Sequence, residues 1–129
     1  MAPHPPPPPQ PNHFDELSIT YHSRSELFAI SGDYDKALFD INLSIKLLPN
    51  IDKYLRKNQI LRALKKFREA KRLVTQLIEM SIRGDIDLKY MTIERLEDLN
   101  LFNDNDLQTY GDYDDTRAEI CSIQSYYDF

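Results

Sequence analysis

The fold is decided by a pattern of apolar and aromatic residues that occurs twice, in YHSRSELFAISGDYDKAL at residues 21–38 and in YLRKNQILRALKKFREAK at residues 54–71. In each copy, two runs of apolar residues at helical spacing are separated by a short break, so each copy predicts a helical hairpin. One constant shift along the chain aligns the apolar positions of the two copies: Tyr21 with Tyr54, Phe28 with Leu61, Tyr34 with Phe67, Ala37 with Ala70, Ile41 with Val74, and Ile45 with Ile78.

Outward from these copies, helical spacing of apolar residues continues over residues 14–82 and predicts four helices. Gly32 ends the first helix, Asp33 or Asp35 caps the second, and Pro49 ends the second because proline cannot donate the next backbone hydrogen bond. No sustained period-two alternation and no Asn-Gly turn is present, so strands are not expected. The predicted fold class is all-α.

The aligned residues have a packing role. Ala37 and Ala70 are small because the two helices of each hairpin are expected to cross closely there, and Tyr34 and Phe67 fill the wedge where each second helix begins. A single hairpin leaves an apolar face open. Stacking of the two hairpins is therefore expected to bury the core.

This repeat of about 34 residues, with paired aromatic residues, an alanine and a closing proline, resembles the tetratricopeptide repeat (TPR) family over residues 18–82. The resemblance implies two stacked TPR-type helix hairpins, a fragment of an α-solenoid. Arg24-Ser25 and Lys57-Asn58 depart from the usual Leu-Gly pair, and Lys65 replaces a turn glycine. About three repeats are usually needed, so residues 92–101 form a capping helix, or another chain pairs with the domain, or the chain belongs to a longer array.

The resemblance further implies a protein-interaction adaptor, because TPR arrays bind peptides in a concave groove formed by the first helix of each repeat. We expect the groove to bind a peptide or protein partner, with no cofactor. The candidate peptide-binding residues are His22, Ser23, Glu26, Asp52, Leu55, Arg56, Gln59 and Arg62.

One subclass of the family clamps the C-terminal carboxylate of heat-shock chaperones that end in an EEVD-type motif, and the two repeats look most like this co-chaperone type. Arg56 stands at the position of the last clamp arginine. The companion lysine is replaced by Asp52, with Lys53 adjacent, and a clamp asparagine is replaced by Ser23. A carboxylate pocket needs several converging donors, so the clamp remains an alternative to the general adaptor.

Charge is distributed unevenly along the chain, whose net charge is −5. Residues 46–83 contain eleven Lys and Arg against three acidic residues, whereas residues 97–129 contain nine Asp and Glu against Arg117 alone. The basic segment favours an acidic peptide partner. A basic helical nucleic-acid-binding module is the alternative from a different class, opposed by the acidic total and by basic residues spread around two helices.

The rest of the chain is divided by composition. Seven prolines within residues 1–13 predict a disordered, extended leader, with a ligand for a proline-binding domain as the alternative. Residues 83–102 are expected to form a linker and the capping helix, and residues 103–129 an acidic, disordered tail.

No catalytic chemistry is expected. The three histidines lack metal-ligand spacing, the three glycines form no phosphate-binding loop, and the single cysteine, Cys121, lies among acidic residues that disfavour a thiolate. No apolar run is long enough to cross a bilayer, and no signal peptide is recognisable. A cytoplasmic or nuclear location is therefore expected.

Overall fold

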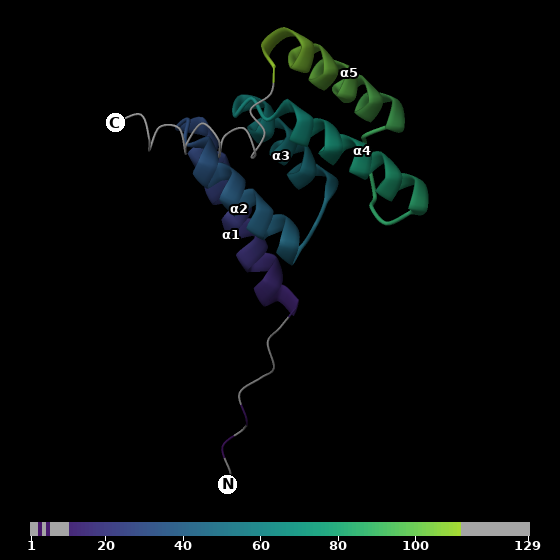
Figure 1. Ribbon diagram of the computed structural model, residues 1–129. Helices are drawn as coiled ribbons and strands as arrows, with labels where there is room; N and C mark the ends of the chain where they lie inside the picture. Colours follow the sequence, from purple (N-terminus) through teal and green to yellow (C-terminus); the bar gives the residue numbers. More distant parts are fainter. Residues whose placement is uncertain (1–2, 4, 6–10, 112–129) are drawn as a thin grey trace, which may run out of the picture.

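The structure is a computed structural model that describes Pro3, Pro5 and residues 11–111 (Figure 1). Within this part of the chain all regular structure is helical, which confirms the predicted all-α class. Each helix packs against the next one along the chain (Figure 1). The five helices are α1 (Pro11–Ile30), α2 (Tyr34–Leu47), α3 (Ile51–Ala63), α4 (Phe67–Arg83) and α5 (Ile93–Tyr110).

The turns of the two hairpins have the same geometry. Gly32 has a φ of 83°, and Lys65, which occupies the equivalent position of the second copy, has a φ of 61°, so both residues adopt the left-handed conformation. The backbone N–H of Asp33 donates to the carbonyl of Phe28 at 2.8 Å, and the N–H of Lys66 donates to that of Leu61, also at 2.8 Å. The lysine therefore forms the turn that glycine forms in the first copy, at the cost of an unfavourable φ.

The small residues that were predicted at the helix crossings lie in the core. Ala37 and Ala70 are fully buried. The hydroxyl of Ser25 donates to the carbonyl of Ala37 at 2.7 Å, which requires close approach of α1 to α2. Beside Ser25, Arg24 donates two hydrogen bonds, of 2.6 and 2.8 Å, to the buried carboxylate of Asp40 on α2. The Arg24-Ser25 departure from the family pattern is thus accommodated by polar contacts between α1 and α2.

The helix ends follow the local sequence. Asp33, rather than Asp35, caps α2, and α2 ends at Leu47, before Pro49. The side chain of Asn50 accepts a hydrogen bond of 3.0 Å from the N–H of Lys53 and caps α3. Gly84 ends α4 in the left-handed conformation, with a φ of 79°, as a C-terminal glycine commonly does.

The last helix, α5, packs on α4 and differs in length from the prediction. Leu96 is fully buried in a cluster with Ile51, Val74 and Leu77. The helix continues to Tyr110 instead of ending near Leu101, so residues 103–110, assigned above to a disordered tail, are helical. Asparagine and aspartate are weak helix formers, and the sequence pattern therefore placed the helix end too early.

The first helix also exceeds its predicted bounds. It begins at Pro11, so residues 11–13 belong to α1 and not to the proline-rich leader. Proline is compatible with the first turn of a helix, where its missing N–H has no partner to lose. Residues 1–2, 4, 6–10 and 112–129, on which the rest of the leader and the rest of the acidic tail were predicted, lie outside the described part.

Candidate functional site

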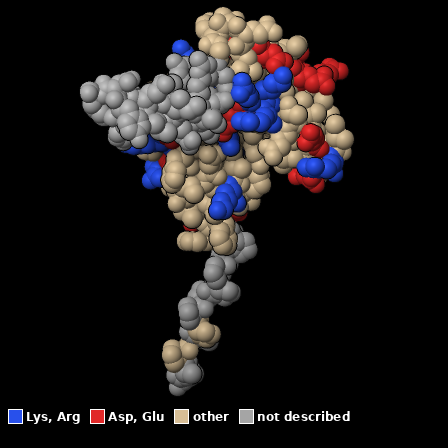
Figure 2. Space-filling view, viewed as in Figure 1, with Lys and Arg blue, Asp and Glu red and all other residues tan. Residues whose placement is uncertain are grey.

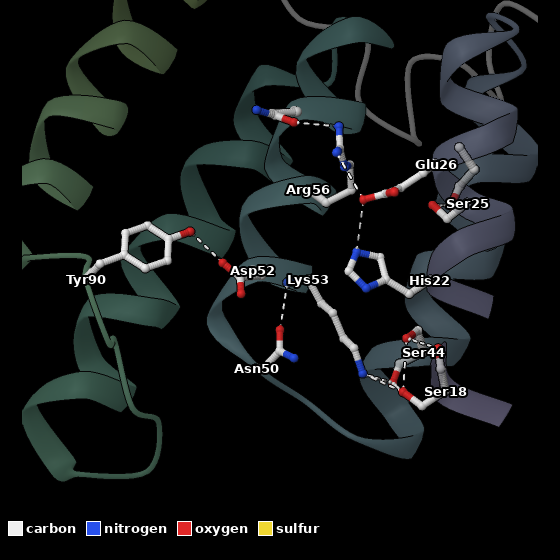
Figure 3. Close-up of polar contacts among 12 residues, drawn as sticks. Ser18, His22, Ser25, Glu26, Ser44, Asn50, Asp52, Lys53, Arg56 and Tyr90 are labelled. Carbon is white, nitrogen blue, oxygen red and sulfur yellow. Dashed lines mark hydrogen bonds and ion pairs between the residues drawn. The ribbon is translucent and has the colours of Figure 1, made fainter. Parts of the chain in front are cut away.

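Four of the eight predicted groove residues meet between α1 and α3. Nη2 of Arg56 lies 3.2 Å from Oε1 of Glu26, and Nη1 of Arg56 donates to the side-chain carbonyl of Gln59 at 3.1 Å. Nε2 of His22 lies 3.5 Å from the same Glu26 oxygen (Figure 3). The guanidinium of Arg56 therefore already has a carboxylate partner within its own chain.

The other four predicted residues point elsewhere. Arg62 donates to Asp106 on α5 at 2.7 Å, and Leu55 packs against the core cluster that contains Leu96. Ser23 is exposed on α1. Asp52 accepts a hydrogen bond of 2.5 Å from the hydroxyl of Tyr90 (Figure 3), which raises the pKa of that hydroxyl.

Tyr90 is a contact that the sequence pattern did not reveal. It lies in the connection between α4 and α5, and its neighbours Leu88 and Met91 pack against the buried cluster at Ile51. This packing places the phenol hydroxyl beside Asp52. Consequently, the position of the clamp lysine is occupied by Asp52, whose carboxylate is hydrogen-bonded to Tyr90.

Lys53 was the other candidate for the clamp lysine, and it is buried, with an exposure of 3%. Its ammonium donates to the hydroxyl of Ser18 and to the backbone carbonyl of Leu48, and lies 3.4 Å from the carbonyl of Ser44 (Figure 3). Burial lowers the pKa of Lys53, and the negative charge of Asp15 opposes this effect only in part.

The Lys53 contacts join α1, α3 and the C-terminal end of α2. Ser18 and Ser44 are fully buried, and the hydroxyl of Ser44 also donates to the carbonyl of Ser18 at 2.7 Å. Serines at core-facing positions of two adjacent helices were the sequence feature that could have indicated a buried polar partner. Lys53 therefore has a structural position and is not available to a ligand in the groove.

Beside the Arg56 cluster the surface between α1 and α3 is hollowed and mainly apolar. The hollow has a volume of about 270 Å³ and is lined by Ala29, Ile30, Tyr34, Arg56, Gln59, Ile60 and Ala63. Three aliphatic side chains on α1, at spacings of eight and three residues, share one side of that helix and are 62%, 66% and 84% exposed: Ile19, Leu27 and Ile30. The site thus combines an apolar hollow, the exposed aliphatic side chain of Ile30 and the charge pair of Arg56 with Glu26.

In residues 11–111 no group of three or more His, Cys, Asp or Glu side chains is arranged to hold a metal ion. None of the helices described is long and apolar enough to span a membrane. Comparison with known proteins identifies no relative: no protein-family model, no curated protein and no solved structure matches this chain.

Proposed function

We propose that this chain is a protein-interaction adaptor that binds an apolar peptide segment of another protein in the groove between α1 and α3. The observation that carries the proposal is the apolar hollow with the exposed side chain of Ile30 in its lining, and two more aliphatic side chains, Ile19 and Leu27, are exposed on the same helix. Exposed apolar patches are unfavourable in water and commonly mark binding surfaces. The TPR resemblance of residues 18–82 supports the same groove as a peptide site.

The ligand is expected to be an apolar side chain followed by a polar or charged group. The hollow would take the apolar side chain, because Ala29, Ile60 and Ala63 form its walls. Arg56 and Glu26, both partly exposed, would then bond polar groups of the peptide backbone or its side chains. Because these two side chains also bond each other, the site is close to neutral and should not require an acidic ligand.

This arrangement disfavours the carboxylate-clamp alternative. A clamp needs several cations that converge on one carboxylate. Here Arg56 is paired with Glu26, Lys53 is buried, and Asp52 adds negative charge on the same helix. We therefore propose a groove that selects internal apolar segments over free C-terminal carboxylates.

The test is selection of peptides from a random displayed library by the full chain, followed by binding measurements on variants. Ile30→Asp should abolish binding of the selected peptides, because Ile30 is 84% exposed and contributes to the hollow. The matched control is Ile82→Asp, since Ile82 is 71% exposed and also lies at the end of a helix, α4. The proposal fails if both variants bind equally, or if only peptides with a free C-terminal carboxylate are selected.

A further inference from the structure

Each of the two hairpins has a hollow between its helices, and the two hollows occupy equivalent places in the sequence repeat. The first hollow, between α1 and α2, has a volume of about 400 Å³, and the second hollow, between α3 and α4, has a volume of about 610 Å³. The shift that aligns Tyr21 with Tyr54 also aligns six residues of the two linings. These pairs are Arg24 with Lys57, Phe28 with Leu61, Asp35 with Arg68, Lys36 with Glu69, Phe39 with Arg72, and Asp40 with Leu73.

In the first hollow, a cation and a carboxylate of the same chain form an ion pair. The guanidinium of Arg24 donates hydrogen bonds of 2.6 and 2.8 Å to the carboxylate of Asp40, which is buried. The same guanidinium lies 5.9 Å from the centre of the Phe28 ring. The first hollow thus contains the anionic partner of its own cation.

The second hollow keeps the cation but lacks the carboxylate. Lys57 replaces Arg24, whereas Leu73, which is buried, replaces Asp40. Among the residues that the structure describes, Lys57 forms no ion pair and no side-chain hydrogen bond. Burial lowers the pKa of Lys57, and the negative charge of Glu69 opposes this effect only in part. The Lys57 ammonium therefore loses hydration without gaining the partner that Arg24 has.

The second hollow is also the larger of the two. Leu61 takes the place of Phe28, so an aliphatic side chain replaces a ring, and the hollow extends along α4 as far as Glu79. Its lining places the apolar side chains of Leu61 and Leu73 in the same hollow as Lys57. Because apolar surroundings exclude water, an ion pair formed there is screened less than one on an open surface.

Arg72 adds a second cation to the lining, at the position where the first hollow has Phe39. Arg72 is exposed, and in the described part of the chain neither it nor Lys57 forms an ion pair with the two acidic residues of the lining, Glu69 and Glu79. Glu79 is seven residues from Arg72, roughly 10 Å along the helix axis. Two donors in the lining are thus open to a ligand.

Two further cations of the lining already have partners. The ammonium of Lys71 lies 2.6 Å from Oδ1 of Asp104 on α5, and Arg68 interacts with another group. On the face drawn in Figure 2, Lys and Arg side chains lie beside Asp and Glu side chains, so charge alone does not mark a binding site there. What distinguishes Lys57 is that its equivalent in the first copy has a carboxylate partner.

We propose that the second hollow binds an aspartate or glutamate side chain of another protein, which pairs with Lys57 as Asp40 pairs with Arg24. Arg72 donates further hydrogen bonds to the same carboxylate, because charge-assisted hydrogen bonds are the strongest that a carboxylate accepts. Leu61 and Leu73 pack against the methylene groups of the bound side chain. None of the residues that line the hollow between α1 and α3 lines this one, so the two sites are independent.

The test is a titration of the full chain, isotope-labelled at its lysine side chains, with N-acetyl-glutamate N-methylamide. The Cε signal of Lys57 should shift to saturation, whereas that of Lys46, an exposed lysine of α2, should not. The corresponding glutamine compound has nearly the same shape without the charge and should shift neither signal. Equal shifts of both lysines, or equal shifts with the glutamine compound, would overturn the proposal.

A pair of lysine variants gives a second test, with affinity measured from the backbone amide signals around the hollow. Lys57→Met should weaken binding of the glutamate compound about tenfold, because it removes a hydrogen bond to a charged group. Lys46→Met removes the same charge outside the hollow and should leave the affinity unchanged. Wild-type affinity in Lys57→Met would contradict the pairing. Inorganic phosphate that competes at equal concentration would reveal a general anion site and would also refute the proposal as stated.

Transfer of the first ion pair into the second copy gives a third test. In the variant Lys57→Arg with Leu73→Asp, the internal carboxylate should pair with the arginine and exclude the glutamate compound, because its effective concentration is on the order of millimolar or higher. Undiminished binding by the folded double variant would refute the equivalence of the hollows. Leu73 is buried, so if the double variant does not fold, Lys57→Met and its control decide the question. Ile30→Asp, the groove variant, should bind the glutamate compound like wild type, so failure of this proposal is separable from failure of the proposed function.

Discussion

Replacement of Lys65 with glycine should stabilise the protein. Lys65 has a φ of 61° and is one of two described non-glycine residues with positive φ. Its side chain is exposed, and its N–H donates to the carbonyl of Arg62 at 3.0 Å, a bond that glycine would retain. The substitution therefore removes backbone strain without removing a buried contact.

The size of the effect follows from two opposing terms. The left-handed conformation costs an L-residue roughly 1–2 kcal/mol, and glycine loses about 0.5–1 kcal/mol more conformational entropy on folding. The balance is a net stabilisation of roughly 0.5–1 kcal/mol. For a domain of this size, this corresponds to a rise in Tm of about 2–8 °C.

The measurement is urea unfolding followed by far-ultraviolet circular dichroism, with Lys65→Ala as the control for the lost charge. Lys65→Ala should gain nothing, because alanine meets the same strain at positive φ. Gly32→Ala is the reciprocal change at the equivalent turn and should destabilise the fold. A Cβ atom at Gly32 would meet no atom within 4 Å, so the loss there would come from the backbone alone.

The reasoning would be refuted if Lys65→Gly were no more stable than Lys65→Ala. It would also be refuted if Gly32→Ala were as stable as the wild type. Either result would mean that the two turns are not equivalent and that the sequence repeat does not describe the backbone.

Three further predictions concern the helix crossings, the buried lysine and the groove. Ala37→Leu and Ala70→Leu should each cost about 1–3 kcal/mol in urea unfolding, because both positions are fully buried in the core and a larger side chain overpacks it; variants that unfold like wild type would contradict this packing. Burial lowers the pKa of Lys53 in the folded state below its ordinary value of 10.5. Between the folded-state pKa and 10.5 the unfolded state binds more protons than the folded state, so the free energy of unfolding rises with pH across this range. Lys53→Met should flatten that rise, and an unchanged slope would show that Lys53 titrates normally. Calorimetry with peptides that end in EEVD should detect weak or no binding, whereas Glu26→Gln, which frees Arg56, should strengthen it; sub-micromolar binding to the wild type would contradict the pairing.

Much of the fold could be predicted because the relevant information is local. Apolar residues at helical spacing indicate the helices, and the first two helices end within a few residues of Gly32 and Pro49, as predicted. In the alignment Lys65 replaces a turn glycine, and the structure gives it the left-handed conformation that Gly32 has in the first copy. Each of these features depends on residues that are neighbours in the chain.

The partners of the polar side chains depended on the tertiary structure. Glu26 and Arg56 are 30 residues apart, Ser18 and Lys53 are 35 apart, and Asp52 and Tyr90 are 38 apart. The last turns of α5 also depend on a distant partner, because the side-chain amide of Asn103 donates a hydrogen bond to the side-chain carbonyl of Asn58, 45 residues earlier. Such pairs form only when the hairpins pack at a particular angle and depth, and residue spacing contains no information on either. The sequence alone therefore determined the helices and their turns. Packing between the hairpins decided which charged side chains of the predicted groove are paired, because those contacts join segments that only the folded chain brings together.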